Sequence, residues 1–125
     1  MKKIISTDTA PAAIGPYSQA VQIGDMLFTS GQIPLNPQTM KVETDDISAQ
    51  TKQVMENIKA VLAAADFSLE NVVKCTIFLA DMNDFAKVNE VYGAYFAQNP
   101  PARSCVEVSR LPLDVKVEIE CIASR

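Results

Sequence analysis

The spacing of apolar residues predicts one long amphipathic helix from Asp45 to about Asp66. Apolar or small side chains recur there every three or four residues, with Lys, Gln and Glu side chains between them. The positions expected to face the core are Ile47, Thr51, Val54, Ile58, Val61, Leu62 and Ala65. Thr44, Asp45 and Asp46 stand at the start, where their side-chain oxygens can accept hydrogen bonds from the unpaired N–H groups of the first turn.

A second apolar stripe predicts a helix from Asp84 to about Gln98. Its expected core face consists of Phe85, Val88, Tyr92, Tyr95 and Phe96. Asn83 is the expected cap. Asn99-Pro100-Pro101 is the expected stop, because a residue that precedes proline disfavours helical geometry.

Short runs rich in β-branched and apolar residues predict the strands. They cover residues 20–23, 26–29, 72–79, 104–108 and 115–122. Gly24-Asp25 separates the first two runs by the two residues typical of a hairpin. Leu111-Pro112-Leu113-Asp114 is the predicted turn before the last strand, and residues 30–44 are read as a loop because they contain Pro34 and Pro37.

The order, which counts three strands before the first helix although only two of them have assigned ranges, is strand, strand, strand, helix, strand, helix, strand, strand, and it predicts an α+β fold. Its expected form is a two-layer mixed sheet that carries both helices on one face. In the last strand, Val115, Val117, Ile119, Cys121 and Ala123 alternate with Lys116, Glu118, Glu120 and Ile122. Residues 72–79 alternate in the same mixed way, with Val72 on the side of Lys74 and Val73 on the side of Cys75. A second face that is half apolar favours an oligomer that covers it.

Length and composition predict a single domain over residues 1–125, since 48% of the residues are hydrophobic. No segment approaches the run of about 20 apolar residues that spans a bilayer, and no apolar signal core follows the first residues. A cytoplasmic protein is therefore expected. The net charge of −4 provides no positive field for phosphate backbones, which makes nucleic acid an unexpected partner.

The chain contains no histidine, which excludes Ser-His-Asp and Cys-His catalytic groups and histidine-based metal sites. Cys75, Cys105 and Cys121 lie in apolar runs without the spacing of a zinc site or a redox pair, so buried free thiols are expected. Neither a metal nor a cofactor is predicted. Chemistry in this chain must use arginine, carboxylates, hydroxyls, main-chain groups and water.

Arg103 and Glu118 are the charged residues that best fit such chemistry, because each lies in a strand-like apolar context. A guanidinium binds a carboxylate through two parallel hydrogen bonds, and a glutamate can hold and activate water. The pair suggests a site for a small carboxylate-bearing molecule. A structural ion pair is the ordinary alternative for such residues.

Three separated motifs resemble the RidA family, also known as the YjgF/YER057c/UK114 family. They are Ile14-Gly15-Pro16-Tyr17-Ser18-Gln19-Ala20, then Phe28-Thr29-Ser30-Gly31-Gln32-Ile33-Pro34, and Pro101-Ala102-Arg103-Ser104-Cys105-Val106 with Val117-Glu118-Ile119. Asn83-Asp84-Phe85 and Val88-Asn89-Glu90-Val91-Tyr92 lie between them and also match. The resemblance covers essentially the whole chain.

The resemblance implies a chorismate-mutase-like fold, assembled as a homotrimer with three equivalent clefts between subunits. It implies hydrolysis of reactive enamines and imines, 2-iminobutanoate and 2-iminopropanoate, to 2-oxo acids and ammonia, without cofactor or metal. This activity removes reactive products of pyridoxal-phosphate-dependent dehydratases before they cause damage.

The resemblance also implies roles for individual residues. Arg103 corresponds to the family's carboxylate-binding arginine, and Glu118 to the acid that positions the attacking water. Cys105 contacts the ligand through its main chain, and it shares a strand face with Arg103 by parity. The remaining substrate-binding positions implied are Tyr17, Ser30, Gly31 and Asn89.

Two other functions remain open from the sequence. One is a non-catalytic regulator that binds 2-oxo or amino acids in the same cleft. The other is a ribonuclease that inhibits translation, which the acidic pI near 4.7 and the missing histidine disfavour. Turnover of an imine separates the first alternative from the deaminase, and RNA binding tests the second.

Overall fold

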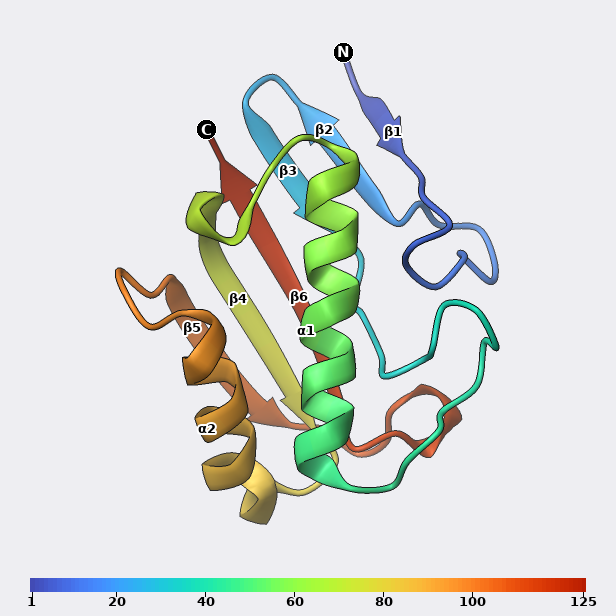
Figure 1. Ribbon diagram of the computed structural model, residues 1–125, viewed down its shortest axis with the longest axis vertical. Helices are drawn as coiled ribbons and strands as arrows, with labels where there is room; N and C mark the ends of the chain where they lie inside the picture. Colours follow the sequence, from blue (N-terminus) through green and yellow to red (C-terminus); the bar gives the residue numbers. More distant parts are fainter.

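The computed structural model describes residues 1–125 as a six-stranded sheet with two α-helices on one face (Figure 1). The strands are β1 (Lys3–Ile5), β2 (Ala20–Ile23), β3 (Met26–Thr29), β4 (Val72–Leu79), β5 (Ala102–Glu107) and β6 (Val117–Ser124), and the helices are α1 (Ile47–Ala64) and α2 (Phe85–Tyr95). The strand order is β1-β2-β3-β6-β4-β5, in which only β4 and β5 are parallel. The predicted two-layer α+β class is therefore confirmed.

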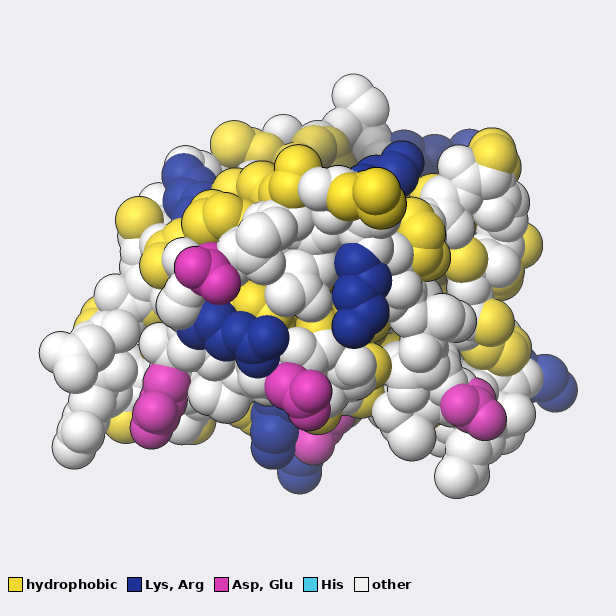
Figure 2. Space-filling view, turned by 90° about the horizontal axis from the view of Figure 1, so that it is seen from above, with side chains coloured by type: hydrophobic (Ala, Val, Ile, Leu, Met, Phe, Trp, Pro, Cys, Tyr) yellow, Lys and Arg dark blue, Asp and Glu magenta, His cyan; other side chains and the backbone are white.

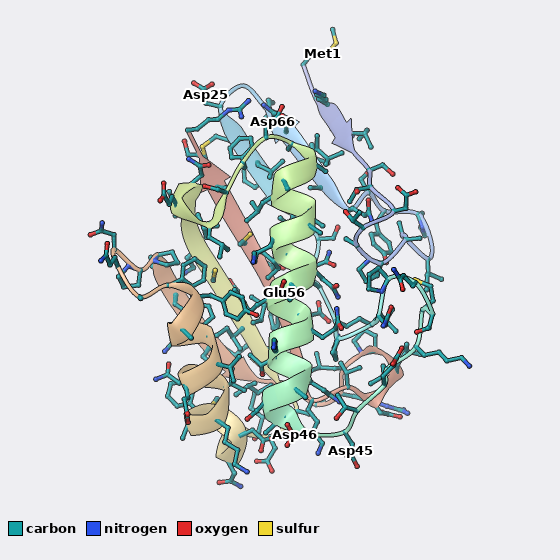
Figure 3. The ribbon with its side chains drawn as sticks, in the orientation of Figure 1. Met1, Asp25, Asp45, Asp46, Glu56 and Asp66 are labelled. Carbon is teal, nitrogen blue, oxygen red and sulfur yellow. The ribbon has the colours of Figure 1, made fainter.

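Helix α1 forms as predicted because its start is capped and its apolar stripe is buried. The Asp46 side chain accepts a hydrogen bond from the Ala49 N–H at 2.8 Å, and Thr44 Oγ1 accepts one from the Asp46 N–H at 3.0 Å. Figure 3 shows Asp45 and Asp46 at the end of the sheet where this helix begins. The positions predicted to face the core are all buried. The helix ends before Asp66, whose φ of 61° lies in the left-handed region.

Helix α2 differs from its prediction at both ends. Asn83 does not cap it, because Met82–Asp84 form a 3₁₀ turn, η2, in which Asp81 accepts a hydrogen bond from the Asn83 N–H at 2.9 Å. The helix stops at Tyr95 rather than near Gln98, since the Phe96 N–H already bonds in 3₁₀ fashion to the Gly93 carbonyl. The residues before Pro100 and Pro101 thus leave helical geometry earlier than expected.

The core lies between the sheet and the two helices. In β6, Val117, Ile119, Cys121 and Ala123 are all buried, as the period-two pattern predicts. The strand itself begins two residues later than predicted, because 3₁₀ turn η3 (Pro112–Asp114) and the residues after it carry the chain to Lys116. Strand β5 begins two residues earlier than predicted, at Ala102.

The first residues of β4 contradict the predicted alternation. Val72 is buried and Val73 is 46% exposed, whereas the pattern placed Val73 with Cys75 on the core face. The pairing of β4 with β6 shifts between Val72 and Lys74, which is a β-bulge. The extra residue reverses the parity at this end of the strand.

The sheet face without helices carries a mixture of apolar and charged side chains. Phe28, Phe78, Val106 and Ile122 lie on it, each at least partly exposed, together with Lys74, Thr76, Glu118 and Glu120. The expected half-apolar second face is thus present. No helix in the structure has both the length and the apolar character needed to cross a membrane.

Candidate functional site

Arg103 lies on edge strand β5, on the face covered by α2. It stands opposite Cys75, whose side chain is buried under the helices. Its Nη1 donates a hydrogen bond of 2.6 Å to Asn89 Oδ1. Its Cζ lies 5.4 Å from the centre of the Phe85 ring and 5.2 Å from that of Tyr92. The helix therefore holds the guanidinium through one amide and two aromatic rings.

The charge of Arg103 has no acidic partner in the chain. The only ion pairs are Lys59–Glu56 and Arg110–Asp114. The other N–H groups of Arg103 make no hydrogen bond within the protein. Arg103 lines a depression of about 460 Å³, together with Asn89, Tyr92, Gly93, Phe96, Pro100 and Pro101. A cation held by neutral groups beside open space is suited to bind a carboxylate from outside the chain.

Cys105 follows Arg103 on the same face, opposite Ile77, as its parity predicted. The thiol is only partly buried, so the expectation of full burial is wrong for Cys105 and correct for Cys75 and Cys121. The reason is its place on an edge strand. Partial burial raises the pKa of the Cys105 thiol, although the Arg103 charge acts in the opposite direction. A thiol with a raised pKa is a poor nucleophile, so the structure does not favour a covalent role for the Cys105 thiol.

Glu118 lies on the uncovered face of the sheet, opposite Phe78 and beside Gly31. A Cβ atom at position 31 would lie 2.8 Å from Glu118 Cδ and 3.1 Å from its Cγ. Two hydrogen bonds between Gln32 and Ile119, of 2.8 and 3.1 Å, hold the segment in this place. Glycine is thus the residue that lets the Glu118 carboxylate lie against the chain.

Ser30 and Gly31 supply polar groups next to Glu118. Ser30 Oγ donates to the Ser18 carbonyl at 2.5 Å, and its N–H donates to the Gln19 carbonyl at 2.9 Å. The Gly31 N–H has no hydrogen-bond partner in the chain. This free donor and the carboxylate form a small polar group, which we call the Glu118 group: Ser30, Gly31 and Glu118.

The Glu118 carboxyl is half-buried without a cation or hydrogen-bond donor to stabilise its charge. Burial raises its pKa above the ordinary 4.5, and the negative charge of Glu120 raises it further. A carboxyl with a raised pKa exchanges protons more readily near neutral pH. Glu118 is therefore suited to take a proton from water and return it.

Replacing Gly31 with alanine is expected to remove activity while leaving the protein folded. The new methyl group displaces the Glu118 carboxylate, which is the flexible end of a side chain and can turn away; overpacking of this kind costs about 1–3 kcal/mol. We expect kcat to fall about as far as it does when Glu118 itself is replaced. Thermal unfolding measured together with imine hydrolysis, the activity expected from the family resemblance, tests this, and full activity of Gly31→Ala would exclude the contact as functional.

Tyr17 lies in the long connection between β1 and β2, one residue before Ser18, whose carbonyl accepts the Ser30 hydroxyl. Its side chain is 50% exposed, and its hydroxyl oxygen accepts a hydrogen bond from the Ile14 N–H at 3.2 Å. The hydroxyl proton thus remains free for donation. The ring borders a depression of about 420 Å³ formed largely by this connection.

The structure brings the predicted site residues together in two sets rather than one. Arg103, Asn89 and Cys105 belong to the helix-covered side, whereas the Glu118 group belongs to the uncovered side. The registers prove this, because Cys75 and Phe78 point to opposite faces of β4. One chain alone therefore cannot present Arg103 and Glu118 to the same small molecule.

Sequence reasoning missed the contacts of Phe85 and Tyr92 with Arg103 and assigned both rings to the core. Tyr92 is buried, but Phe85 is 36% exposed, so that assignment is wrong for Phe85. Residues 85, 89 and 92 are separated by four and three positions and share one face of α2. This spacing could have indicated from the sequence that Phe85, Asn89 and Tyr92 contact a common partner.

No group of three or more His, Cys, Asp or Glu residues is arranged to hold a metal ion.

Comparison with known proteins gives concordant matches over the whole chain. Residues 7–125 match the family model described as Endoribonuclease L-PSP. A RutC family protein of Pyrococcus horikoshii is 58% identical over 123 residues, covering 98% of each chain. The 2-iminobutanoate/2-iminopropanoate deaminase of Escherichia coli K12 is 54% identical over 128 residues, covering 100% of this chain and 99% of the relative. The crystal structure of E. coli TdcF with bound serine superposes with a TM-score of 0.94 at 52% identity, covering 98% of both chains.

Proposed function

Since the chain belongs to the RidA family, described by its model as Endoribonuclease L-PSP, we propose that it is a cofactor-independent imine hydrolase. Its proposed substrates are 2-iminobutanoate and 2-iminopropanoate, and its products are the corresponding 2-oxo acids and ammonia. The observation that carries the proposal is the guanidinium of Arg103, which is fixed by neutral side chains and left without an acidic partner. Every 2-imino acid carries the carboxylate that this cation requires.

The proposed reaction needs little from the protein. The imine carbon is already electrophilic, so the site must hold the substrate carboxylate and place a water about 3 Å from that carbon. The reacting form is the protonated imine: as the water oxygen bonds to carbon, the C=N π electrons move to nitrogen and Glu118 accepts one water proton, which gives a neutral amino alcohol. Glu118 then returns this proton to the amine nitrogen. The C–N bond breaks as the hydroxyl oxygen forms the carbonyl, the hydroxyl proton passes to Glu118, and the nitrogen leaves as ammonia, which takes up that proton in water. The raised pKa of Glu118 favours these transfers.

We propose that the site is assembled between subunits of a homotrimer. Arg103, Asn89 and Cys105 of one subunit would face the Glu118 group and Tyr17 of the next. Two observations support this arrangement: the two sets lie on opposite faces of one sheet, and the uncovered face is half apolar. Closed assembly would also cover Phe28, Phe78 and Ile122.

The regulator alternative rests on the E. coli TdcF structure, whose description states bound serine. An amino acid carries the same carboxylate as an imino acid, so Arg103 would bind both. A regulator would bind such ligands without converting them. The ribonuclease alternative is disfavoured by the net charge of −4. On the face seen in Figure 2, Lys and Arg side chains lie among Asp and Glu side chains, without a purely basic patch.

The experiment for the proposed function generates 2-iminobutanoate in place with a threonine dehydratase and traps the surviving imine with semicarbazide. Slower trapping in the presence of the protein is expected, because hydrolysis removes the imine first. Untrapped imine also hydrolyses spontaneously to the same 2-oxo acid, so the rate at which semicarbazone forms is the informative quantity. An unchanged trapping rate would reject the hydrolase and favour the regulator.

A further inference from the structure

Gln19 is a buried polar residue for which neither the fold nor the proposed reaction gives a role. Its side chain is 4% exposed. Its Oε1 accepts a hydrogen bond from the Thr7 N–H at 2.7 Å. Its Nε2 donates to the carbonyl oxygens of Pro11 at 2.8 Å, Thr7 at 2.9 Å and Ala10 at 3.3 Å. Both ends of the amide are therefore fully used, and only an amide provides this combination of donor and acceptor.

These bonds hold a connection that has no regular structure of its own. Residues 6–19 between β1 and β2 form neither helix nor strand. Tyr17 lies in this connection, where the local main-chain bond from its N–H to the Gly15 carbonyl shapes only a tight turn. Gln19 is the last residue of this connection, directly before β2 begins at Ala20, and its side-chain amide binds back to Thr7, Ala10 and Pro11 near the start of the connection. Without it, three carbonyls and one N–H would lose their partner.

The main chain at Gln19 also reaches the Glu118 group. The Gln19 carbonyl accepts the Ser30 N–H at 2.9 Å, and the neighbouring Ser18 carbonyl accepts the Ser30 hydroxyl at 2.5 Å. Ser30 precedes Gly31, against which the Glu118 carboxylate lies. Gln19 is thus bonded on its side-chain end to the connection that carries Tyr17 and on its main-chain end to the segment that supports Glu118.

We propose that Gln19 is a positioning residue that fixes Tyr17 relative to Glu118. The catalytic part of this inference rests on the proposed function, because it requires Tyr17 to contact the substrate. Its physical basis is separate: a loop of irregular chain keeps one geometry only where buried partners satisfy its main-chain groups. A loosened connection would leave Tyr17 present but displaced, and small displacements of contacting groups are costly for catalysis.

The first test uses hydrogen exchange of the unmodified protein. The Thr7 N–H lies outside every strand, yet it bonds to a buried oxygen, so we expect it to exchange at least about tenfold more slowly than the unbonded amides of the same connection. In Gln19→Leu, we expect this protection to be lost while amides of β6 keep theirs. Fast exchange at Thr7 in the unmodified protein would overturn the inference without any activity measurement, and that result does not require the variant to fold.

The second test is a double-mutant cycle with Tyr17→Ala, measured by imine hydrolysis. If Gln19 acts through Tyr17, Gln19→Leu lowers kcat/KM by about tenfold in the unmodified background and by less than about twofold in the Tyr17→Ala background. The control is Gln22→Leu on the same strand, since Gln22 bonds only within its own turn, to the Gly24 carbonyl at 3.1 Å. Gln22→Leu is expected to leave kcat/KM unchanged in both the unmodified and the Tyr17→Ala background.

The outcomes separate the inference from the proposed function. Equal losses in the two backgrounds would mean that Gln19 has a merely structural role, and this would overturn the inference. Absence of hydrolysis by the unmodified protein would reject the proposed function, and hydrogen exchange at Thr7 and β6 would still decide whether Gln19 holds the connection. Two results together support the inference and the proposed function: non-additive losses of kcat/KM in the double-mutant cycle, and faster hydrogen exchange in Gln19→Leu that is confined to residues 6–18.

Discussion

Arg103→Ala is expected to lower kcat/KM for 2-iminobutanoate by about 10²–10³-fold, because it removes a charge that hydrogen-bonds the substrate carboxylate. Stability is expected to change little. Arg103 forms no ion pair, and its single internal hydrogen bond goes to Asn89 near the surface, where water can replace it. The trapping assay measures the activity, and thermal unfolding measures the stability.

Two further variants define the role of Arg103. Arg103→Lys keeps the charge but loses the planar pair of donors, so we expect activity between those of alanine and arginine. Arg110→Ala is the matched control, since Arg110 is exposed and paired with Asp114 at 2.6 and 3.0 Å. It is expected to hydrolyse imine as the unmodified protein does. Normal activity of Arg103→Ala would refute carboxylate binding by this residue.

Glu118→Gln is expected to reduce kcat by about 10²–10⁴-fold, because an amide cannot take a proton from the attacking water. Glu120→Gln is the control: it lies on the same strand and the same face but is exposed, so activity is expected to remain, with the acid limb shifted to lower pH because the Glu120 charge no longer raises the pKa of Glu118. We also expect activity of the unmodified protein to fall with acid at a pH above 4.5, the ordinary value, because the pKa of Glu118 is raised. Equal activity of Glu118→Gln and the unmodified protein would remove this residue from the mechanism.

The same substitution is expected to stabilise the fold at neutral pH. The folded-state pKa of Glu118 is raised, so between 4.5 and that higher value the folded protein binds more protons than the unfolded chain. Stability contributed by this group therefore falls as pH rises through that interval, and the charged carboxylate remains unfavourable above it. Glutamine carries no charge at any of these pH values, so Glu118→Gln does not lose this stability as the pH rises. Urea unfolding near pH 7 and below pH 4.5 should show a gain for Glu118→Gln at the higher pH and none at the lower.

The sequence predicted the fold well where one element alone carries the pattern. The stripe of α1 needs no knowledge of its neighbours, and neither does the alternation of Val117, Ile119 and Cys121 in β6. The predictions were wrong or incomplete where contact with a second segment of the chain determines the local structure. The reversal at Val72 and Val73 depends on a bulge in the pairing with β6, and the contact of Phe85 with Arg103 joins α2 to a strand distant in the sequence, β5.

The candidate site shows the same division. Residue type and motif pointed to Arg103 and Glu118, and parity placed Cys105 beside Arg103. Parity shows which residues of one strand share a face of the sheet. It does not show whether a residue of another strand lies on the same face. Only the two registers along β4 show that Arg103 and Glu118 point in opposite directions. The role of Gln19 was equally invisible, because its partners are main-chain groups of a connection without periodic pattern.

The central claim is that each site combines Arg103 of one subunit with Glu118 of its neighbour. It is tested most directly by mixing two inactive proteins, Arg103→Ala and Glu118→Gln, under conditions that dissociate and reassemble the oligomer. With equal amounts and random assembly in a closed ring, about a quarter of the sites receive both intact residues, so about a quarter of the unmodified activity is expected to return. Reassembled mixtures that stay as inactive as the separate variants would contradict a site shared between subunits.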